Sequence, residues 1–346
     1  CILCFRRYVI KTILITYGTR PEIIKLSPVI RELGKKGISF KTVFTGQHRE
    51  LYEDVKDLIP KPDYHLTIMR ENQTLTNIMA GISSEFVEIL QNESPDLLMV
   101  QGDTTTVVVT AMIAFYEKIP VGHVEAGLRT YDLTSPFPEE GNRQMVSRIA
   151  RFNWAPTQLA AKQLQKENIG NIIITGNTVI DACNNFTFPI SYDDKILITL
   201  HRRENFGEPM EKIFIEINQL AKKHSHLEFI FPMHPNPNVQ KLRPILQHIT
   251  VVDPLGYPDM MNLLSSVKFV ISDSGGVQEE CAAFGKKVLV CRNTTERPEG
   301  LDAGFAKLVH TNIIEHFNWA NKSPKWSGEN PYGNGNASKI IIDSLF

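Results

Sequence analysis

Short apolar runs rich in β-branched residues alternate with longer amphipathic segments along almost the whole chain. A nearly continuous apolar run indicates a strand buried on both faces, and apolar residues spaced three or four apart indicate a helix. Strands that are joined through helices in this way run parallel to one another. The pattern therefore predicts an α/β protein with parallel sheets that are covered by helices on both faces.

The apolar runs predict eleven strands in two groups. The first group comprises residues 12–18, 41–46, 96–103, 121–126 and 172–177; the second comprises residues 195–201, 227–234, 249–255, 268–275, 287–292 and 307–311. So many strands exceed what one doubly wound sheet holds comfortably. We therefore expect two sheets and two domains.

A turn-rich segment without periodicity, residues 184–195, separates the two groups of strands. We predict Rossmann-like domains over residues 10–182 and 183–330, with the hinge near residues 181–194 and the active site in the cleft between them. We expect residues 331–346 to form a C-terminal helix that packs back on the N-terminal domain. Residues 1–9 are interpreted as a non-essential extension, because a lysine at position 11 interrupts their resemblance to a signal peptide.

Composition and charge narrow the classes of function. The 346 residues are 42% hydrophobic and 22% charged with a net charge of −1, which indicates a soluble globular protein that neither nucleic acid nor an anionic membrane attracts. No apolar run approaches the roughly 20 residues that span a bilayer. The five cysteines are scattered and show no metal-ligand spacing, which predicts neither disulfides nor a zinc site and favours the reducing cytoplasm.

Polar clusters directly follow several predicted strands. The carboxyl ends of parallel strands lie at one edge of a sheet, which is where open α/β sheets bind their ligands. The densest cluster is "HVEAGLRTYDLTSPFPEEGNR", residues 123–143, with four carboxylates, two arginines and a histidine. A solvated loop is the ordinary interpretation of such charge, but its place between a buried strand and a helix start favours a ligand site. The other clusters are residues 18–22, 101–105, 201–205, 234–235 and 272–276.

Single residues in these clusters leave alternatives open. Asp103 ends a buried strand, where it can be a partly desolvated base, the cap of the next helix, or both. Glu139 and Arg143 are four apart on a helix, which ordinarily indicates only a weak ion pair. Arg20 and His234 taken alone are better explained by structural roles.

Two glycines lie between a strand and a helix in "SDSGGVQEE", residues 272–280. They let the backbone approach a ligand closely, and the free N–H groups of a helix start favour an anion such as a diphosphate. Glu279 and Glu280 then lie where ribose hydroxyls can donate to them; the alternative is an ordinary capped helix start.

His201 follows a strand beside two arginines and is either a phosphate partner or a packing residue. Neither a dinucleotide fingerprint after the first strand nor a P-loop is present.

Nine ordered motifs together make the chain resemble the non-hydrolysing UDP-N-acetylglucosamine 2-epimerases. They are "GTRPEIIK" (18–25), "TGQHRE" (45–50), "QGDTTT" (101–106), "HVEAGLRT" (123–130), "PEEGNR" (138–143), "GNTVIDA" (176–182), "HRRENFG" (201–207), "MHPNP" (233–237) and "SDSGGVQEE" (272–280). The resemblance covers residues 11 to about 340. It implies a two-domain GT-B fold, usually in a homodimer, that binds UDP-GlcNAc, UDP-ManNAc and UDP.

The resemblance further implies a reaction that needs no cofactor and no metal. UDP leaves by anti elimination to give 2-acetamidoglucal, and its re-addition with a proton on the opposite face of C2 gives the epimer. The family's catalytic residues match Asp103, Glu125, Glu139, Arg143 and His201. Its nucleotide contacts or their neighbours match Arg20, Lys25, His234, Ser274, Gly275, Gly276 and Glu280.

The resemblance also implies regulation by a second UDP-GlcNAc, bound at Gln47, His48 and Arg70. The alternative is that Gln47 and His48 cap the following helix. Three rival functions remain at this point: a hydrolysing 2-epimerase, a GT-B glycosyltransferase with a UDP-sugar donor, and a UDP-sugar-binding protein without activity. The filled carboxylate positions argue against the last two.

Overall fold

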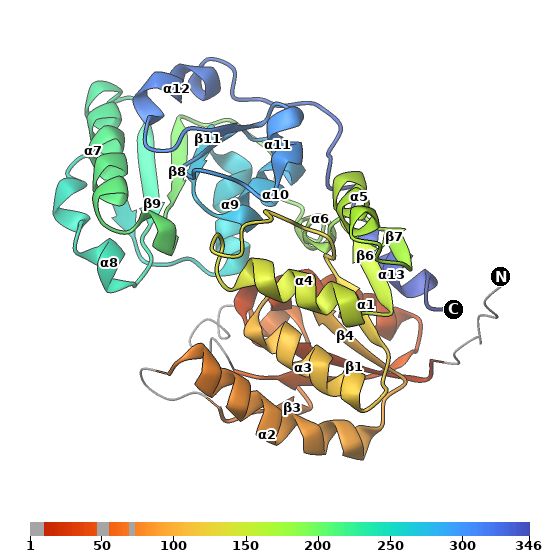
Figure 1. The fold of residues 1–346 in the computed structure, drawn as a ribbon. Helices are drawn as coiled ribbons and strands as arrows, with labels where there is room; N and C mark the ends of the chain where they lie inside the picture. The colour runs from red at the N-terminus through yellow and green to blue at the C-terminus, as the bar shows by residue number, and fades with distance from the viewer. Residues whose placement is uncertain (1–9, 47–54, 69–72) are drawn as a thin grey trace. The chain divides into compact units, whose positions relative to one another are not determined.

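The computed structural model of the chain describes residues 10–46, 55–68 and 73–346 (Figure 1). The described chain divides into two compact units. The first runs to Ala182 and also includes Gly333–Phe346, and the second is Cys183–Tyr332. Each unit is built on a parallel sheet of its own.

The first unit contains a seven-stranded parallel sheet in the order β3-β2-β1-β4-β5-β6-β7. Its strands are β1 Thr12–Tyr17, β2 Ser39–Phe44, β3 Tyr64–His65, β4 Leu97–Gln101, β5 Val121–Val124, β6 Phe152–Ala155 and β7 Ile172–Ile174. The middle strands β1, β4 and β5 are mostly apolar and are buried except for Thr12 at the start of β1, because helices cover both faces. This packing leaves the strand ends as the place where polar side chains can gather.

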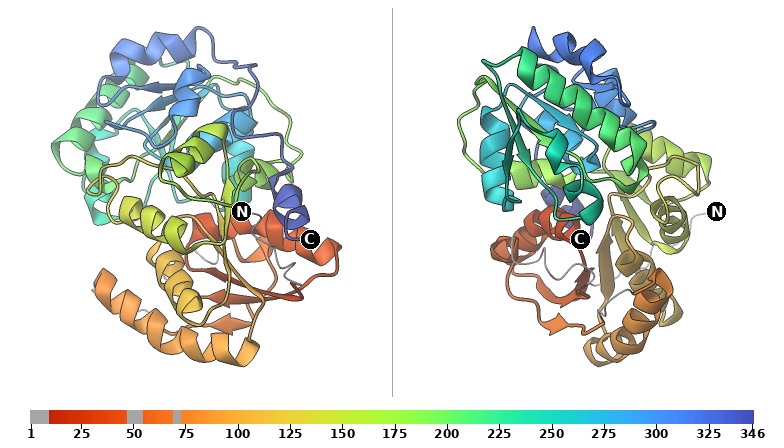
Figure 2. Two further views of the ribbon diagram at one scale, coloured as in Figure 1. Left: turned by 45° about the vertical axis from the view of Figure 1, so that its right-hand side comes forward. Right: turned by 90° about the vertical axis from the view of Figure 1, so that its left-hand side faces the viewer.

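The helices of the first unit are α1 Arg20–Lys35, α2 Leu75–Glu93, α3 Thr105–Tyr116, α4 Glu139–Ile149, α5 Gln158–Lys166, α6 Thr178–Cys183 and α13 Ala337–Asp343, with a short 3-10 helix at Lys56–Leu58. Helices α2, α3 and α4 share one apolar core with β1, β4 and β5. Figure 2 shows α1, in red, on the opposite side of the sheet from α2 and α3. Helix α13 joins this unit because the Asp181 carboxylate accepts the backbone N–H groups of Ala337 at 3.1 Å and Ser338 at 2.8 Å.

The second unit has a six-stranded parallel sheet in the order β10-β9-β8-β11-β12-β13. Its strands are β8 Lys195–Thr199, β9 Glu228–Pro232, β10 Thr250–Val252, β11 Phe269–Ser272, β12 Val288–Val290 and β13 Ala306–Leu308. Its helices are α7 Glu208–Lys223, α8 Pro237–Gln240, α9 Tyr257–Ser266, α10 Gly275–Ala283, α11 Pro298–Asp302 and α12 Ile313–Asn321, with 3-10 helices at Arg203–Asn205 and Arg243–Ile245. One core packs α7 and α12 against β8, β9 and β11 around Phe214, Phe231, Phe269 and Phe317.

The predicted fold class is confirmed: both sheets are parallel, and each has the strand order of a Rossmann fold. Each of the eleven predicted apolar runs overlaps a strand. Strands β3 and β6 were not predicted. β3 is only two residues long, and β6 reads "FNWA", whose buried polar Asn153 interrupts the apolar pattern.

Two further findings concern the described residues only. No helix among them is both long enough and apolar enough to cross a bilayer. The three cysteines in this part of the chain, Cys183, Cys281 and Cys291, are buried free thiols.

Candidate functional site

Glu125 lies directly after β5 at a positive φ of 67°, which turns its side chain out of the strand direction. Its carboxylate accepts from Lys25 Nζ at 2.5 Å, from Asn177 Nδ2 at 3.1 Å and from the Gln101 side-chain amide. Only 7% of the side chain is exposed. A buried carboxylate is costly unless it is paired and hydrogen-bonded, and here one cation and two amides satisfy it.

Lys25, which the family resemblance assigns to the nucleotide site, extends from α1 within the first unit. Its ammonium group is buried and donates to Glu125, so in this structure its partner is a candidate catalytic carboxylate. Arg20 is the first residue of the same helix, next to the turn that follows β1. The beginning of α1 thus contributes charge to the same end of the sheet as Glu125.

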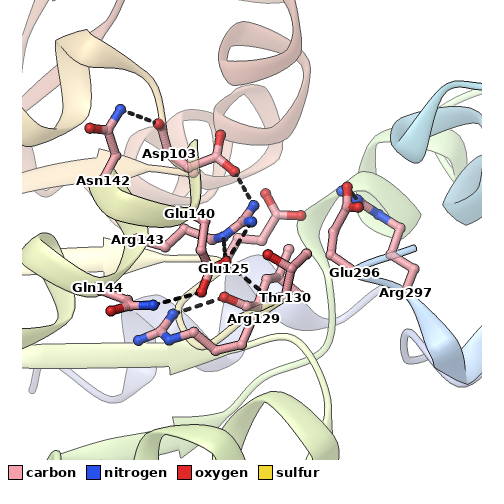
Figure 3. Close-up of polar contacts among 12 residues, drawn as sticks. Asp103, Glu125, Arg129, Thr130, Glu140, Asn142, Arg143, Gln144, Glu296 and Arg297 are labelled. Carbon is pink, nitrogen blue, oxygen red and sulfur yellow. Dashed lines mark hydrogen bonds and ion pairs between the residues drawn. The ribbon is translucent and has the colours of Figure 1, made fainter. Parts of the chain in front are cut away.

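Asp103 lies in the turn after β4, where Gly102 has a φ of 83°. Its Oδ2 accepts from Arg143 Nη1 at 2.7 Å, and its main-chain oxygen accepts from Asn142 Nδ2 at 2.8 Å (Figure 3). The side chain is 27% exposed, which leaves it accessible to a substrate.

The interpretation of Asp103 as the cap of the next helix is wrong. The N-cap of α3 is Thr104, whose Oγ1 accepts from Val107 N at 3.4 Å. The cap of α3 is thus one residue later than this alternative assumed. Asp103 is instead bound by Arg143 and Asn142.

Arg143 on α4 connects two carboxylates within the first unit. Besides Asp103, it contacts Glu140 Oε2 through Nη2 at 2.8 Å and Nε at 3.2 Å. Glu140 is fully buried and also accepts from the backbone of Thr130 and Tyr131. Burial raises its pKa, but hydrogen bonds from Gln144, Thr130 and Arg143 outweigh burial and lower it overall.

The candidate Glu139 precedes Glu140 at the start of α4 and is half-buried. The sequence pattern does not distinguish these adjacent acids, since either can lie three or four residues before an arginine on a helix. The structure makes Glu140 the buried partner of Arg143, a role that the sequence did not assign.

His123 and Glu22 support the turn that carries Asp103. His123 Nε2 lies 2.7 Å from the main-chain oxygen of Gly102, and burial lowers the pKa of this histidine to about 4, so its neutral ring donates this bond. Glu22 accepts from the Gly18 and Thr19 N–H groups and, at 2.7 Å, from Thr104 Oγ1. Burial raises the pKa of Glu22 to about 7 despite these hydrogen bonds.

In the second unit, His201 and His234 follow the neighbouring strands β8 and β9. Their rings stack with centroids 5.4 Å apart. The Asp273 carboxylate accepts the backbone N–H groups of His201 and Arg202, and its Oδ1 lies 3.8 Å from His201 Nδ1. Asp273 therefore fixes the backbone of the His201 turn, while the histidine side chain remains 37% exposed.

Helix α10 begins after Ser274, whose side chain makes no cap hydrogen bond. The two glycines differ in their surroundings. A Cβ built on Gly275 would lie 2.4 Å from Arg297 Nη1, whereas one built on Gly276 meets nothing within 4 Å. The close approach at position 275 is therefore to Arg297, whereas a Cβ at position 276 would meet no protein atom.

The two glutamates on α10 also differ. Glu279 is almost fully buried, and its Oε1 accepts from Arg297 Nε at 2.6 Å. This burial and the ion pair with Arg297 argue against Glu279 as the partner of ribose hydroxyls. Glu280 stays the candidate for the ribose.

A buried charge network that was not predicted lies next to α10. Glu296 accepts from Arg292 Nη1 at 2.8 Å and from Arg297, and Arg292 Nε contacts Glu204 at 2.7 Å. Burial raises the pKa of Glu296, but the guanidinium groups of Arg297 and Arg292 lower it well below its usual range. The charged segment "TERPE" after β12 was the only signal of this network.

The proposed effector residues Gln47, His48 and Arg70 lie outside the described residues. Within the ranges that the structure does describe, no three His, Cys, Asp or Glu side chains come together in a way that could hold a metal ion. The paired carboxylates of the first unit are groups of the kind that acid/base catalysis uses, and backbone N–H groups at a helix start such as that of α10 favour an anion.

Comparisons with known proteins agree with these features. The family described as UDP-N-acetylglucosamine 2-epimerase matches residues 31–346. The UDP-N-acetylglucosamine 2-epimerase of Neisseria meningitidis serogroup A is 44% identical, and the match covers 96% of this chain and 98% of that protein.

Solved structures are similar over the same extent. The UDP-GlcNAc 2-epimerase from Neisseria meningitidis bound to UDP-GlcNAc has a TM-score of 0.89 at 43% identity, covering 96% of this chain and 99% of that one. The Methanocaldococcus jannaschii UDP-GlcNAc 2-epimerase in complex with UDP-GlcNAc and UDP has a TM-score of 0.85 at 32% identity, with the same coverage. The GT-B type of the fold is thereby confirmed, and the chain belongs to the UDP-N-acetylglucosamine 2-epimerase family.

Proposed function

We propose that the chain interconverts UDP-GlcNAc and UDP-ManNAc at C2 without hydrolysing the sugar. The observation that carries the proposal is the set of paired carboxylates in the first unit: Asp103 bound to Arg143, and Glu125 bound to Lys25. Inversion at C2 needs a base on one face of the sugar and an acid on the other, and carboxylates of different environments can take these roles. Relatives that carry the family name bind UDP-GlcNAc and UDP.

The proposed reaction has two steps. A carboxylate takes the proton from C2 while the bond between C1 and the UDP oxygen breaks, giving 2-acetamidoglucal and UDP. UDP then adds back to C1, and C2 receives a proton on the opposite face. Asp103, Glu125 and Glu139 are the proposed acid/base groups. Arg143 forms an ion pair with Asp103 and so stabilises its negative charge. No metal or nicotinamide takes part in this scheme.

The second unit is proposed to hold the departing UDP. Its diphosphate would bind at the start of α10 near Ser274, Gly275 and Gly276, where backbone N–H groups favour an anion. His201 and His234 lie on neighbouring strand ends of the same sheet. An imidazole at such a position can pair with a phosphate and donate a proton to it. Glu280 is the proposed partner of the ribose.

Proton NMR of UDP-GlcNAc with the purified protein in D₂O tests this proposal. We expect UDP-ManNAc to form without an acceptor and deuterium to enter C2 of both UDP-sugars. Release of free ManNAc with UDP would instead identify a hydrolysing 2-epimerase. Conversion that requires an added acceptor would identify a glycosyltransferase, and epimer formation without label at C2 would exclude the elimination route.

Three expectations from the family resemblance stay predictions. A homodimer is checked by light scattering on the purified chain, and a cytoplasmic location by fractionation of the source cells. Activation by a second UDP-GlcNAc predicts that pure UDP-ManNAc is converted slowly until a trace of UDP-GlcNAc is added. Prompt conversion of pure UDP-ManNAc, unaffected by added UDP-GlcNAc, would contradict the last of these.

A further inference from the structure

Glu140 lies on α4, beside Arg143 and Gln144 in the charged segment of the first unit (Figure 3). Its Oε2 accepts from Thr130 N at 2.9 Å and from two nitrogens of Arg143; its Oε1 accepts from Tyr131 N at 3.2 Å and from Gln144 Nε2 at 2.8 Å. The side chain is fully buried, so no substrate can reach it without displacing protein. Glu140 is therefore placed to organise its neighbours.

The most important of these neighbours is Arg143. Two of its nitrogens, Nη2 and Nε, are used by Glu140, and the third, Nη1, is the one that reaches Asp103 Oδ2 at 2.7 Å. A guanidinium group is planar and rigid, so fixing one edge fixes the direction of the other nitrogen. The geometry of the Glu140 contact thus sets where Nη1 points.

The two carboxylates that share Arg143 differ in exposure. The side chain of Asp103 is 27% exposed, whereas that of Glu140 has no exposed surface. The inner carboxylate can therefore hold the arginine while the outer one remains available to a reacting group. This division separates a positioning role from a catalytic role within one ion-pair chain.

We propose that Glu140 is a positioning residue that holds Arg143 against Asp103, and that catalysis depends on it although it never touches the substrate. The inference rests on the proposed function, since it assigns Asp103 and Arg143 to the same reaction. Glu140 also accepts from the backbone N–H groups of Thr130 and Tyr131, which links this part of the chain to the start of α4. One carboxylate therefore positions both Arg143 and the backbone at Thr130 and Tyr131.

The test compares Glu140→Gln with a matched control. Gln keeps the size of the side chain but replaces one acceptor oxygen with an NH2 group, which cannot accept from the donors that both oxygens now receive, and it removes the negative charge that pairs with Arg143. We expect kcat to fall by about 10²-fold, as a small misplacement of a catalytic group can cost. UDP affinity, measured by calorimetry, should not change. The control is Glu167→Gln, which removes the charge from another paired glutamate of the same unit, bound to Arg129 at 2.7 Å; it should retain the kcat of the unmodified protein.

A double-mutant comparison tests whether Glu140 acts through Arg143. If it does, Glu140→Gln combined with Arg143→Lys has the same kcat as Arg143→Lys alone. Independent losses that multiply in the double variant would overturn the proposal, and so would an unchanged kcat in Glu140→Gln. Should Glu140→Gln fail to fold, Glu140→Asp keeps the buried charge but shortens the side chain, and the same loss of kcat is expected from it.

A crystal structure of Glu140→Gln separates this inference from the proposed function. Arg143 displaced from Asp103 supports the positioning role whatever reaction the protein catalyses. Arg143 retained at its present distance from Asp103 overturns it, even if the protein is an epimerase. Absence of epimerase activity in the unmodified protein would remove the proposed function and leave this geometric test intact.

Discussion

The ammonium group of Lys25 and the carboxylate of Glu125 form a buried ion pair, with 2.5 Å between Nζ and Oε1, although one hundred residues separate them in the sequence. One partner lies on the first helix and the other directly after β5. From this pair we infer that Lys25 serves the acid/base group, whereas the family resemblance assigns it to the nucleotide, and the two roles have different consequences.

Lys25→Met should lower kcat and leave UDP affinity unchanged. Removing the cation raises the pKa of the Glu125 carboxyl group, so the acid limb of the pH profile of kcat/KM should move to higher pH if Glu125 acts as a base. Loss of UDP affinity with an unshifted pH profile would return Lys25 to the nucleotide site.

The same substitution should also destabilise the first unit, by about 3 to 5 kcal/mol, because it leaves a buried carboxylate without its cation. The matched control is Lys25→Met combined with Glu125→Gln, in which no charge remains. Thermal unfolding should show the double variant to be more stable than Lys25→Met alone, and a double variant that is less stable would contradict the ion-pair interpretation.

Asp103→Asn should lower kcat by about 10² to 10⁴-fold, which is the usual contribution of a general acid or base. UDP affinity should remain, because the proposed UDP site lies in the second unit. Glu139→Gln is expected to behave in the same way. The control is Asp132→Asn, because Asp132 is an exposed carboxylate that accepts hydrogen bonds from Thr134 within its own turn. Full activity of Asp103→Asn would remove this residue from the catalytic set.

The sequence predicted the architecture well because the burial of a strand produces a local pattern of apolar residues. Each long apolar run became a strand, and the polar residues after β4, β5, β8 and β11 mark the strand ends. The two missed strands are those in which this pattern is weakest: β3 has two residues, and β6 contains the buried Asn153.

Side-chain partners were less predictable, because they depend on packing between distant segments. Nothing local distinguishes Glu140 from Glu139; the choice depends on which one faces Arg143 and the backbone at Thr130. Likewise, the sequence does not distinguish Gly275 from Gly276. Their surroundings differ in the structure because Arg297 lies against Gly275 alone. The candidate residues could therefore be named from motifs, but their division into catalytic, pairing and positioning groups required the structure.

Gly276→Ala should weaken UDP binding without destabilising the second unit. A methyl group at this position meets no protein atom within 4 Å, so only a ligand at the helix start would feel it. Alanine is also the better helix former by about 1 kcal/mol, which should raise the temperature of unfolding slightly. Calorimetric titration with UDP measures the first effect and thermal unfolding the second.

Gly275→Ala is the matched comparison. Its methyl group would lie 2.4 Å from Arg297 Nη1, so it should displace the guanidinium that Glu279 and Glu296 hold, and destabilise the protein even without a ligand. Unchanged UDP affinity in Gly276→Ala would place the diphosphate elsewhere.

Glu22 should make the stability of the first unit depend on pH. Burial raises its pKa in the folded chain from the ordinary value of 4.5 to about 7, so the folded state binds a proton more tightly than the unfolded state. Between these two values the unfolded chain carries fewer protons, and the free energy of unfolding falls as the pH rises. The contribution is on the order of 3 kcal/mol, the equivalent of the difference in pKa.

Glu22→Gln isolates this effect, because its amide resembles the protonated acid and can donate to Thr104 Oγ1. The variant should be about as stable as the unmodified protein near pH 5 and more stable than it near pH 8, since only the unmodified protein must ionise a buried group there. Thermal unfolding of both proteins across this range measures the difference, and other titrating groups cancel because both chains share them. If the unfolding temperatures of the two proteins changed with pH in parallel, Glu22 would titrate at the same pH in the folded and unfolded chains. Its hydrogen-bond donors would then balance the effect of its burial.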